Sequence, residues 1–298
     1  MSKEILESDI LQIKKLLKNN FNTEAYTEIE RLGGLTNHTY RIKLNNEEYA
    51  VRIPGEGTES IIVRKDEMIS TKLACSLGID SDLIYFDEYG AKISKYIPDA
   101  VTMNSDTLKE TENIKKAAEL LKVLHSCGAD TKVPFEVFEM AEGYEKIICR
   151  KNVKMFDDYS LIKSEVMKFK EEFDSMTQVK KVPCHNDPLC ENWVKSGEKI
   201  YLIDWEYAGM NDGMWDLADV SIEAGFDENH DYEMLKYYLG KEPSLTDKKH
   251  FLINKIYVDY LWTLWAKARV PYDGQPMEDW AAERYARLKT FIKEYRNL

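Results

Sequence analysis

The chain has 298 residues, enough for two compact lobes or one large domain, and with 44% apolar residues it can bury a sizeable core, so disorder is not the expected state. The net charge of −12 argues against a nucleic-acid-binding protein, which normally carries a basic face, but is compatible with a cationic substrate. Five cysteines without CxxC spacing, a charged N-terminal segment and the lack of a long apolar run predict a cytoplasmic protein with no membrane insertion.

The first hundred residues predict one helix followed by a small antiparallel sheet. Apolar residues alternate with period two in 40–44 and 49–53, which flank Asn45-Asn46 and predict a hairpin. The other elements expected here are a helix to about residue 19, a strand beginning near residue 26, a helix over 61–77 that Gly78 ends, and a second hairpin formed by 83–88 and 91–96.

Pro98-Asp99-Ala100 interrupts this pattern, and helical periodicity dominates from Leu108 onward. We therefore expect an α+β chain with a small N-terminal sheet lobe, 1–97, and a larger, mostly helical C-terminal lobe, 98–298. A short strand is expected at Lys199–Asp204 within the helical half.

Two segments of the second half carry chemistry, HNDPLCEN at 185–192 and IDWEY at 203–207. Phosphoryl transfer needs an oriented hydroxyl and metal-bound phosphates. Asp187 can accept the hydroxyl proton, while Asn192 and Asp204 offer the oxygen ligands that Mg²⁺ prefers. This is the H-x-D-x-x-x-x-N and metal-aspartate layout of protein-kinase-like enzymes, so we expect ATP as co-substrate, Mg²⁺ as cofactor and a bilobal kinase-like fold. His185 is expected to hydrogen-bond the loop backbone so that Asp187 points into the cleft.

Other interpretations of these segments remain. Asp187 and Asn192 could be turn residues around Pro188, and Asp204 could end a strand. A metal hydrolase using His185, Asp187 and Asp204 would be expected to hold more than the five histidines present. The two segments together, correctly spaced and preceded by a sheet lobe, favour the kinase.

The nucleotide is expected to bind on the sheet side. The glycine turn in GGLTNHTY at 33–40 lies between two expected strands and could fold over phosphates through Gly34, Thr36 and Asn37. It is not GxGxxG, and no Walker motif occurs in the sequence, which disfavours a P-loop enzyme. Arg52 stands where kinases carry a phosphate-pairing lysine, with Glu67 as its expected partner. The alternative for both is an ordinary surface charge.

Several further segments strengthen one interpretation. They are IDWEY at 203–207, MND at 210–212, WDLA at 215–218, GGLTNHTY at 33–40, RIPG at 52–55, KYIP at 95–98 and LWTLW at 261–265. Together these segments resemble the choline/ethanolamine kinase family, above all its bacterial LicA-type branch. The resemblance implies phosphorylation of choline to phosphocholine, with adenine meeting the backbone between Lys95 and Ile97. It also implies that Asp216 anchors the catalytic loop.

The last of these segments fits a small cationic alcohol. Trp262 and Trp265 lie three residues apart on an expected helix, so their rings share a face. A quaternary ammonium offers no hydrogen-bond donor and is recognised by aromatic faces and a nearby anion. The alternative is that both tryptophans belong to the core. The resemblance implies that Tyr207 joins this cage and Glu223 supplies the anion. Glu206 is expected to assist the metal or the substrate hydroxyl, or else to be a surface carboxylate.

Departures from the family leave part of the site open. Glu228 stands where eukaryotic relatives carry a further tyrosine. The residues that could complete the cage are Phe226, Tyr272, Trp280 and Tyr285. Ethanolamine, another amino alcohol or an aminoglycoside is the alternative substrate, and a catalytically inert binding module is the alternative from another class. The sequence does not determine the oligomeric state.

Overall fold

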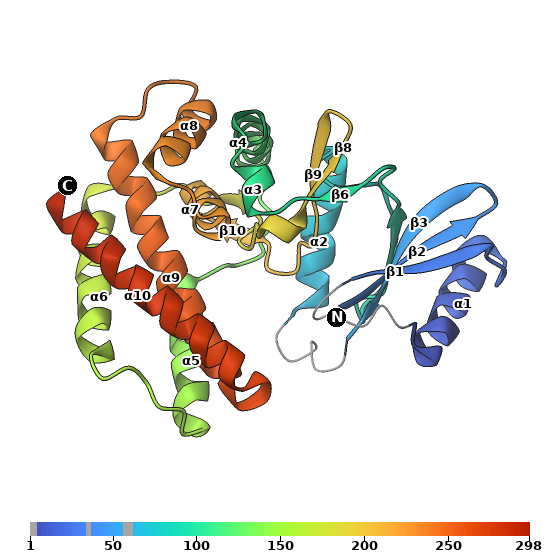
Figure 1. The fold of residues 1–298 in the computed structure, drawn as a ribbon, viewed down its shortest axis with the longest axis horizontal. Coiled ribbons are helices and arrows are strands. Elements are labelled where there is room, and N and C mark those ends of the chain that lie inside the picture. The colour runs from blue at the N-terminus through green and yellow to red at the C-terminus, as the bar shows by residue number, and fades with distance from the viewer. Residues whose placement is uncertain (1–4, 34–36, 56–61) are drawn as a thin grey trace. The chain divides into compact units, whose positions relative to one another are not determined.

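The computed structural model describes residues 5–33, 37–55 and 62–298, and the chain divides into two compact units (Figure 1). Unit 1 comprises Met1–Met103 and Glu191–Ala208, and unit 2 comprises Asn104–Cys190 and Gly209–Leu298. The division is discontinuous in sequence, whereas the sequence predicts one boundary at 97/98. The nucleotide-binding and catalytic roles of the predicted lobes stay predictions.

An antiparallel sheet of five strands, in the order β1-β2-β3-β5-β4, forms the larger sheet of unit 1. The predicted hairpin is confirmed: β2 pairs with β3 up to Leu44 opposite Glu47, leaving Asn45 and Asn46 as a two-residue turn. Both asparagines have positive φ, which such turns require and asparagine tolerates. The strands are β1 Glu28–Gly33, β2 Asn37–Leu44, β3 Glu47–Pro54, β4 Leu83–Phe86 and β5 Lys92–Lys95.

Two helices accompany this sheet, α1 (Glu7–Phe21) and α2 (Arg64–Ser76). The apolar stripe of α1, which includes Ile13 and Leu17, is fully buried against residues of β2, β3 and β5. The Asp9 carboxylate, also on α1, accepts a hydrogen bond of 2.6 Å from the Tyr40 hydroxyl on β2. Burial and this hydrogen bond raise the pKa of Tyr40 to about 12. The polar contact therefore adds to the apolar packing that fixes α1.

A second, three-stranded sheet completes unit 1 with a segment from late in the sequence. Its order is β6-β8-β9, formed by β6 Val101–Thr102, β8 Trp193–Ser196 and β9 Lys199–Leu202. The Leu202 amide also donates to the Ile79 carbonyl at 3.1 Å, and Trp193 and Leu202 are fully buried. The strand expected over Lys199–Asp204 therefore ends two residues early, and Asp204 follows it with φ 69°.

Unit 2 is mostly helical, as predicted. Every residue from Phe251 to Leu264 of α9 is buried, so this helix lies at the centre of the unit and packs along α10 (Figure 1). No helix within the described ranges is long and apolar enough to cross a membrane. The elements of this unit are α3 Ser105–Leu108, α4 Thr111–Ser126, α5 Val137–Arg150, α6 Tyr159–Met176, β7 Val182–Cys184, β10 Gly209–Asn211, α7 Gly213–Ala224, α8 Glu228–Leu239, α9 Leu245–Asp273 and α10 Gln275–Asn297. The short 3-10 helix η2, Cys190–Asn192, begins in unit 2 and ends in unit 1.

Candidate active site

Arg52 lies inside β3, and its guanidinium is buried among groups from three elements. Its Nη1 stands 2.5 Å from Oε1 of Glu67 on α2, and both side chains are almost fully buried. Its Nε and Nη2 donate to the Gly90 carbonyl at 3.3 and 3.0 Å. The predicted pair of Arg52 and Glu67 therefore forms, and the surface-charge alternative is wrong for both. The two charges hold each other ionised: the pKa of Glu67 is lowered despite its burial, through Arg52.

A second arginine, Arg64, shares the same glutamate. Its Nη1 donates to Oε2 of Glu67 at 2.7 Å, so both carboxylate oxygens meet a guanidinium. Gly90 allows this approach, because a Cβ there would stand 2.5 Å from Nε of Arg64 and its φ of +96° also favours glycine. Sequence reasoning missed both residues, although the spacing of Arg64 and Glu67 by three on one helix was a usable signal.

Asn37 and Glu206 extend this network. The Asn37 amide donates to Oε2 of Glu206 at 3.1 Å, and Nη1 of Arg64 lies 3.6 Å from the same oxygen. The Glu206 side chain is only 8% exposed, so the surface-carboxylate alternative is wrong. Burial, reinforced by the neighbouring charge of Asp204, raises the pKa of Glu206 to about 7.

The structure gives little information on how four other residues expected to bind the nucleotide would contact it. Gly34 and Thr36 lie outside the described residues. Lys95 is half exposed and its ammonium pairs with Glu47 at 2.6 Å, while Ile97 is buried. Their expected contacts with adenine run through the backbone, so the nucleotide roles of all four stay predictions.

The hairpin of β8 and β9 brings the two expected metal ligands together. Trp193 pairs with Leu202, and the next residues outward, Asn192 and Ile203, are joined by a hydrogen bond of 3.0 Å from the Ile203 amide to the Asn192 carbonyl. Asp204 follows directly. The hairpin thus brings the backbones of Asn192 and Asp204, twelve residues apart in sequence, to the same end.

The backbone around Asp187 is fixed from α7. The two oxygens of the Asp216 carboxylate accept from the amides of His185 and Asn186 at 2.8 and 2.7 Å. Nδ1 of His185 accepts from the Asp187 amide at 3.3 Å, which confirms the expectation that His185 binds the loop backbone. Asn186 adopts φ 67°, a conformation that asparagine tolerates. Asp216 thus anchors the loop, as the resemblance implies.

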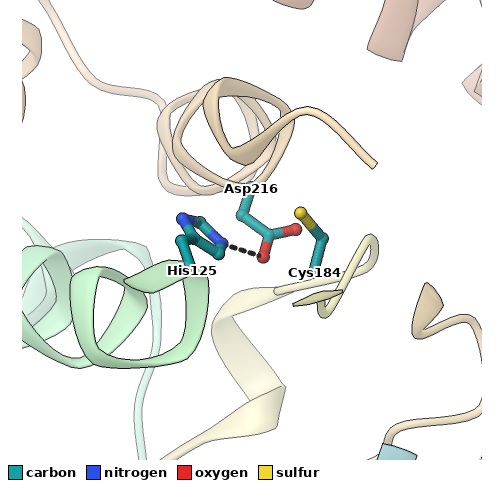
Figure 2. A group of neighbouring side chains, drawn as sticks. All are labelled: His125, Cys184 and Asp216. Atoms are coloured by element: carbon teal, nitrogen blue, oxygen red, sulfur yellow. Dashed lines mark hydrogen bonds and ion pairs between the residues drawn. The ribbon is translucent and has the colours of Figure 1, made fainter. Parts of the chain in front are cut away.

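Asp216 also belongs to a cluster with His125 of α4 and Cys184 of β7 (Figure 2). Their nitrogen, sulfur and oxygen atoms lie within 4.8 Å of one another, close enough for a metal by distance alone. The donors do not favour one. Oδ2 of Asp216 already meets Nε2 of His125 at 2.9 Å, and burial raises the pKa of the Cys184 thiol, which opposes the thiolate that metals require. The cluster is an anchor for the loop.

Three tryptophans of α9 and α10 form a continuous row in unit 2. Trp262 and Trp265 pack edge to face with ring centroids 6.1 Å apart, and Trp265 meets Trp280 in the same manner at 5.8 Å. Trp262 is buried, whereas Trp265 and Trp280 are half-buried. Of the four residues that could complete the cage, Trp280 is the one in contact with this row.

The other aromatic candidates have different surroundings. Tyr285 stacks on Phe156 with centroids 4.0 Å apart, and its hydroxyl donates to Asp158. Tyr272 is 62% exposed, and Phe226 lies against His230. Tyr207 belongs to unit 1 and is half-buried, so its expected place in the cage stays a prediction.

Glu223 lies on α7 in a pair with Arg284 of α10. Nη1 of Arg284 also contacts Asp259 at 3.0 Å, and its guanidinium carbon lies 4.1 Å from the Trp280 ring centroid. The carboxylate expected to serve the substrate therefore already has a cationic partner. No local pattern in the sequence indicates this pairing, because the two residues are 61 positions apart.

Two further residues near Asp187 were missed. Asp219, one turn before Glu223 on α7, is fully buried, and Tyr144 lies on α5. The negative charge of Asp187 contributes to raising the pKa of both, after burial as the larger cause for Tyr144, and after burial and Glu223 for Asp219. The spacing of Asp216, Asp219 and Glu223 on one helical face was a signal for the first of them.

Sequence comparison finds relatives across most of the chain. LicA of Haemophilus influenzae is 25% identical over 260 residues, which cover 85% of this chain and 76% of that protein. The probable ethanolamine kinase of Arabidopsis thaliana is 24% identical over 292 residues, covering 86% of this chain and 77% of the relative.

Solved structures agree with these relatives. The choline/ethanolamine kinase family protein from Mesorhizobium loti is 31% identical, with a TM-score of 0.85 over 96% of this chain and 95% of that one. The choline kinase LicA from Streptococcus pneumoniae is 29% identical, with a TM-score of 0.81 over 97% of this chain and 100% of that one. The aminoglycoside phosphotransferase APH(4)-Ia is 15% identical, with a TM-score of 0.67 over 95% of this chain and 99% of that one. This likeness in fold confirms the protein-kinase-like α+β class.

The sequence model of the choline/ethanolamine kinase family matches residues 29–295, almost the whole of both units. The match confirms the resemblance carried by the motifs between residues 33 and 265. This chain belongs to the choline/ethanolamine kinase family and is a phosphotransferase with an alcohol group as acceptor.

Proposed function

We propose that this protein phosphorylates choline with ATP and Mg²⁺, giving phosphocholine. The observation that carries the proposal is the row of Trp262, Trp265 and Trp280 in the same unit as the buried carboxylates of α7. Aromatic faces bind a quaternary ammonium through the ring quadrupole, each contact contributing about 0.5–2 kcal/mol. The similarity to the choline kinase LicA from Streptococcus pneumoniae supports the same substrate.

In the proposed reaction, Asp187 orients the choline hydroxyl and accepts its proton as the oxygen attacks the γ-phosphorus. The new bond joins the choline oxygen to phosphorus, the bond from phosphorus to the bridging oxygen of ATP breaks, and ADP leaves. The anchored loop suits this role, because a base must be held within about 3 Å of the proton that it takes. Tyr207, Trp262 and Trp265 would bind the trimethylammonium group, with Glu223 as the carboxylate that the family resemblance assigns.

Asn192 and Asp204 would hold Mg²⁺, which supplies charge neutralisation for the phosphates when bound. The donor set fits a hard cation. Among the residues that the structure describes, none forms a hydrogen bond with Oδ1 of Asp204, although Nη1 of Arg52 lies 3.5 Å away as an ionic neighbour. An anionic oxygen that is buried without a hydrogen bond is suited to a metal.

The nucleotide would lie on unit 1. Arg52, held by Glu67, is the expected phosphate partner, and Gly34, Thr36 and Asn37 are the expected contacts of the turn before β2. Lys95 and Ile97 would meet the adenine edge through their backbone atoms. Glu206 would assist the metal or the hydroxyl, which accords with its burial beside Asn37.

The proposal is tested by measuring ADP release with choline, ethanolamine and an aminoglycoside in the presence of Mg²⁺. We expect turnover of choline in the wild type and a loss of about 10²–10⁴-fold in kcat for Asp187→Asn, whose shape is conserved but whose basicity is lost. Asp157→Asn is the matched control, because the Asp157 side chain is 93% exposed. Turnover of another alcohol without choline, or full activity of Asp187→Asn, would refute the assignment.

Ethanolamine is the second candidate substrate. It is favoured by similarity to the probable ethanolamine kinase of Arabidopsis thaliana and to ethanolamine kinase 2 of Rattus norvegicus. A primary ammonium donates three hydrogen bonds, and buried carboxylate oxygens could accept them. A higher kcat/KM for ethanolamine than for choline would favour this candidate.

A further inference from the structure

The acidic face of α7 holds three carboxylates whose surroundings differ. Asp216 is engaged with the loop backbone and His125, and Glu223 is engaged with Arg284. Asp219, between them, is fully buried, and within the described part of the chain neither of its oxygens has a hydrogen-bond partner. Asp219 is thus the carboxylate of this face whose charge is least compensated.

A buried carboxyl without a hydrogen bond is costly, and native proteins contain few of them. Burial, Glu223 and Asp187 together raise the pKa of Asp219 well above its usual range. Arg284 acts in the opposite direction, but its Nη1 and Nη2 are directed to Asp259 and Glu223. A cationic ligand near Asp219 would favour its ionised form and give the carboxylate a partner, so the group is suited to a positively charged occupant.

The neighbours of Asp219 along α7 show where it lies. One turn before it, Asp216 holds the loop that carries Asp187, the proposed proton acceptor. One turn after it, Glu223 pairs with Arg284, whose guanidinium lies over Trp280 of the tryptophan row. On this helix Asp219 therefore stands between the residue that holds the catalytic loop and the residue that is linked to the aromatic rings. A small amino alcohol has the same layout, with its hydroxyl two carbons from its cationic nitrogen.

We propose that Asp219, rather than Glu223, supplies the counter-charge to the substrate ammonium, and that Glu223 instead holds Arg284 and so joins α7 to α10. This inference rests on the proposed function. A quaternary ammonium suits such a carboxylate, since it offers charge without hydrogen-bond donors. Asp219 is a substrate-binding residue in this assignment and takes no part in proton transfer.

The test compares choline with its uncharged carbon isostere, 3,3-dimethylbutan-1-ol, in the wild type, Asp219→Asn and Glu223→Gln. For Asp219→Asn we expect the KM for choline to rise about tenfold to a hundredfold, as for loss of a desolvated charge pair. The kcat/KM of the isostere and the KM for ATP should be unchanged. The melting temperature without ligand should stay near that of the wild type, because an amide of the same shape replaces a carboxyl group that has no hydrogen bond to lose among the described residues.

Glu223→Gln should instead lower the melting temperature, since Arg284 loses a partner, while the preference for choline over the isostere persists. A structural role for Asp219 predicts a lower melting temperature and an equal loss for both alcohols, and either result overturns the inference. Loss of the preference in Glu223→Gln alone would return the role to Glu223.

Failure of the proposed function is distinguishable from failure of this inference. If the wild type turns over ethanolamine but not choline, the preference for the cationic alcohol is measured instead as the kcat/KM of ethanolamine relative to that of its uncharged isostere, propan-1-ol. Only the assignment of choline as the substrate is then wrong. If it turns over neither, calorimetric titration of choline into the wild type and Asp219→Asn decides the matter without catalysis. Equal affinities would overturn the role of Asp219.

Discussion

The surroundings of the Glu206 carboxyl group raise its pKa, and this shift should be measurable as a pH dependence of the protein's stability. Its oxygen accepts from Asn37, yet burial and the neighbouring Asp204 charge prevail and raise its pKa to about 7. In the unfolded chain the same group ionises near its ordinary value of about 4.3. Between these two values the folded state binds more protons than the unfolded state, so the contribution of Glu206 to stability falls as pH rises.

Glu206→Gln should remove this dependence. Glutamine can still accept from Asn37 but cannot ionise, so the variant should gain stability relative to the wild type as pH rises from about 5 to 8. The difference should approach about 3 kcal/mol above pH 7. Urea unfolding of the metal-free proteins at several pH values measures it. A difference that stays constant with pH would contradict the raised pKa.

Among the elements, β3, α2 and the turn before β5 are joined by one guanidinium. Arg52 meets Glu67 through Nη1 and the Gly90 carbonyl through Nε and Nη2. Arg52→Lys keeps a charge for Glu67 but cannot reach both partners with a single ammonium. The free energy of unfolding should fall by about 1–3 kcal/mol, because a buried acceptor loses its hydrogen bond.

Arg41→Lys is the matched control for that experiment. Arg41 lies on the neighbouring strand β2 and pairs with Glu48 at 2.5 Å, but its side chain is 34% exposed. Exposed ion pairs contribute little, so we expect a change within about 0.5 kcal/mol in urea unfolding. Equal stabilities of the two lysine variants would mean that the Gly90 contacts contribute nothing.

Local patterns predicted the elements better than they predicted the site. The alternation in 40–44 and 49–53 gave the hairpin of β2 and β3, and the motif around Asp187 gave a loop that the structure confirms as backbone-anchored. These features depend on neighbours in sequence. The pairing of Glu223 with Arg284 depends on residues 61 positions apart, and no periodicity records it.

Gly90 and Asp219 also show the difference between features that depend on neighbours in sequence and features that depend on tertiary packing. Gly90 reads as an ordinary turn residue, and its close approach to Arg64 follows only from the packing of α2 on the sheet. The spacing of Asp219 placed it on the face of Asp216, but that it has no hydrogen-bond partner among the described residues is a property of the packed helices. Sequence patterns therefore locate chemical groups, whereas tertiary packing decides which of their charges are compensated.

At the scale of the whole molecule, the chain does not divide at 97/98 into two continuous pieces. Unit 1 includes Glu191–Ala208, whose β8 and β9 form a sheet with β6. The Met103 amide donates to the Trp193 carbonyl at 2.8 Å, and Trp193 and Leu202 are fully buried. A fragment that ends at residue 103 would leave β6 unpaired and remove both of these side chains from the core of unit 1.

We therefore expect fragment 1–103 alone to lack a cooperative unfolding transition, and fragment 1–103 joined to 191–208 through a flexible Gly/Ser linker to regain one. Burying two large apolar side chains contributes about 3–6 kcal/mol, comparable with the whole stability of a small domain. Urea unfolding followed by circular dichroism compares the two fragments, with Trp193→Ala in the linked fragment as the control that removes packing but keeps the chain. A cooperative transition in fragment 1–103 alone would show that the first segment folds independently and that Glu191–Ala208 joins a sheet lobe already formed.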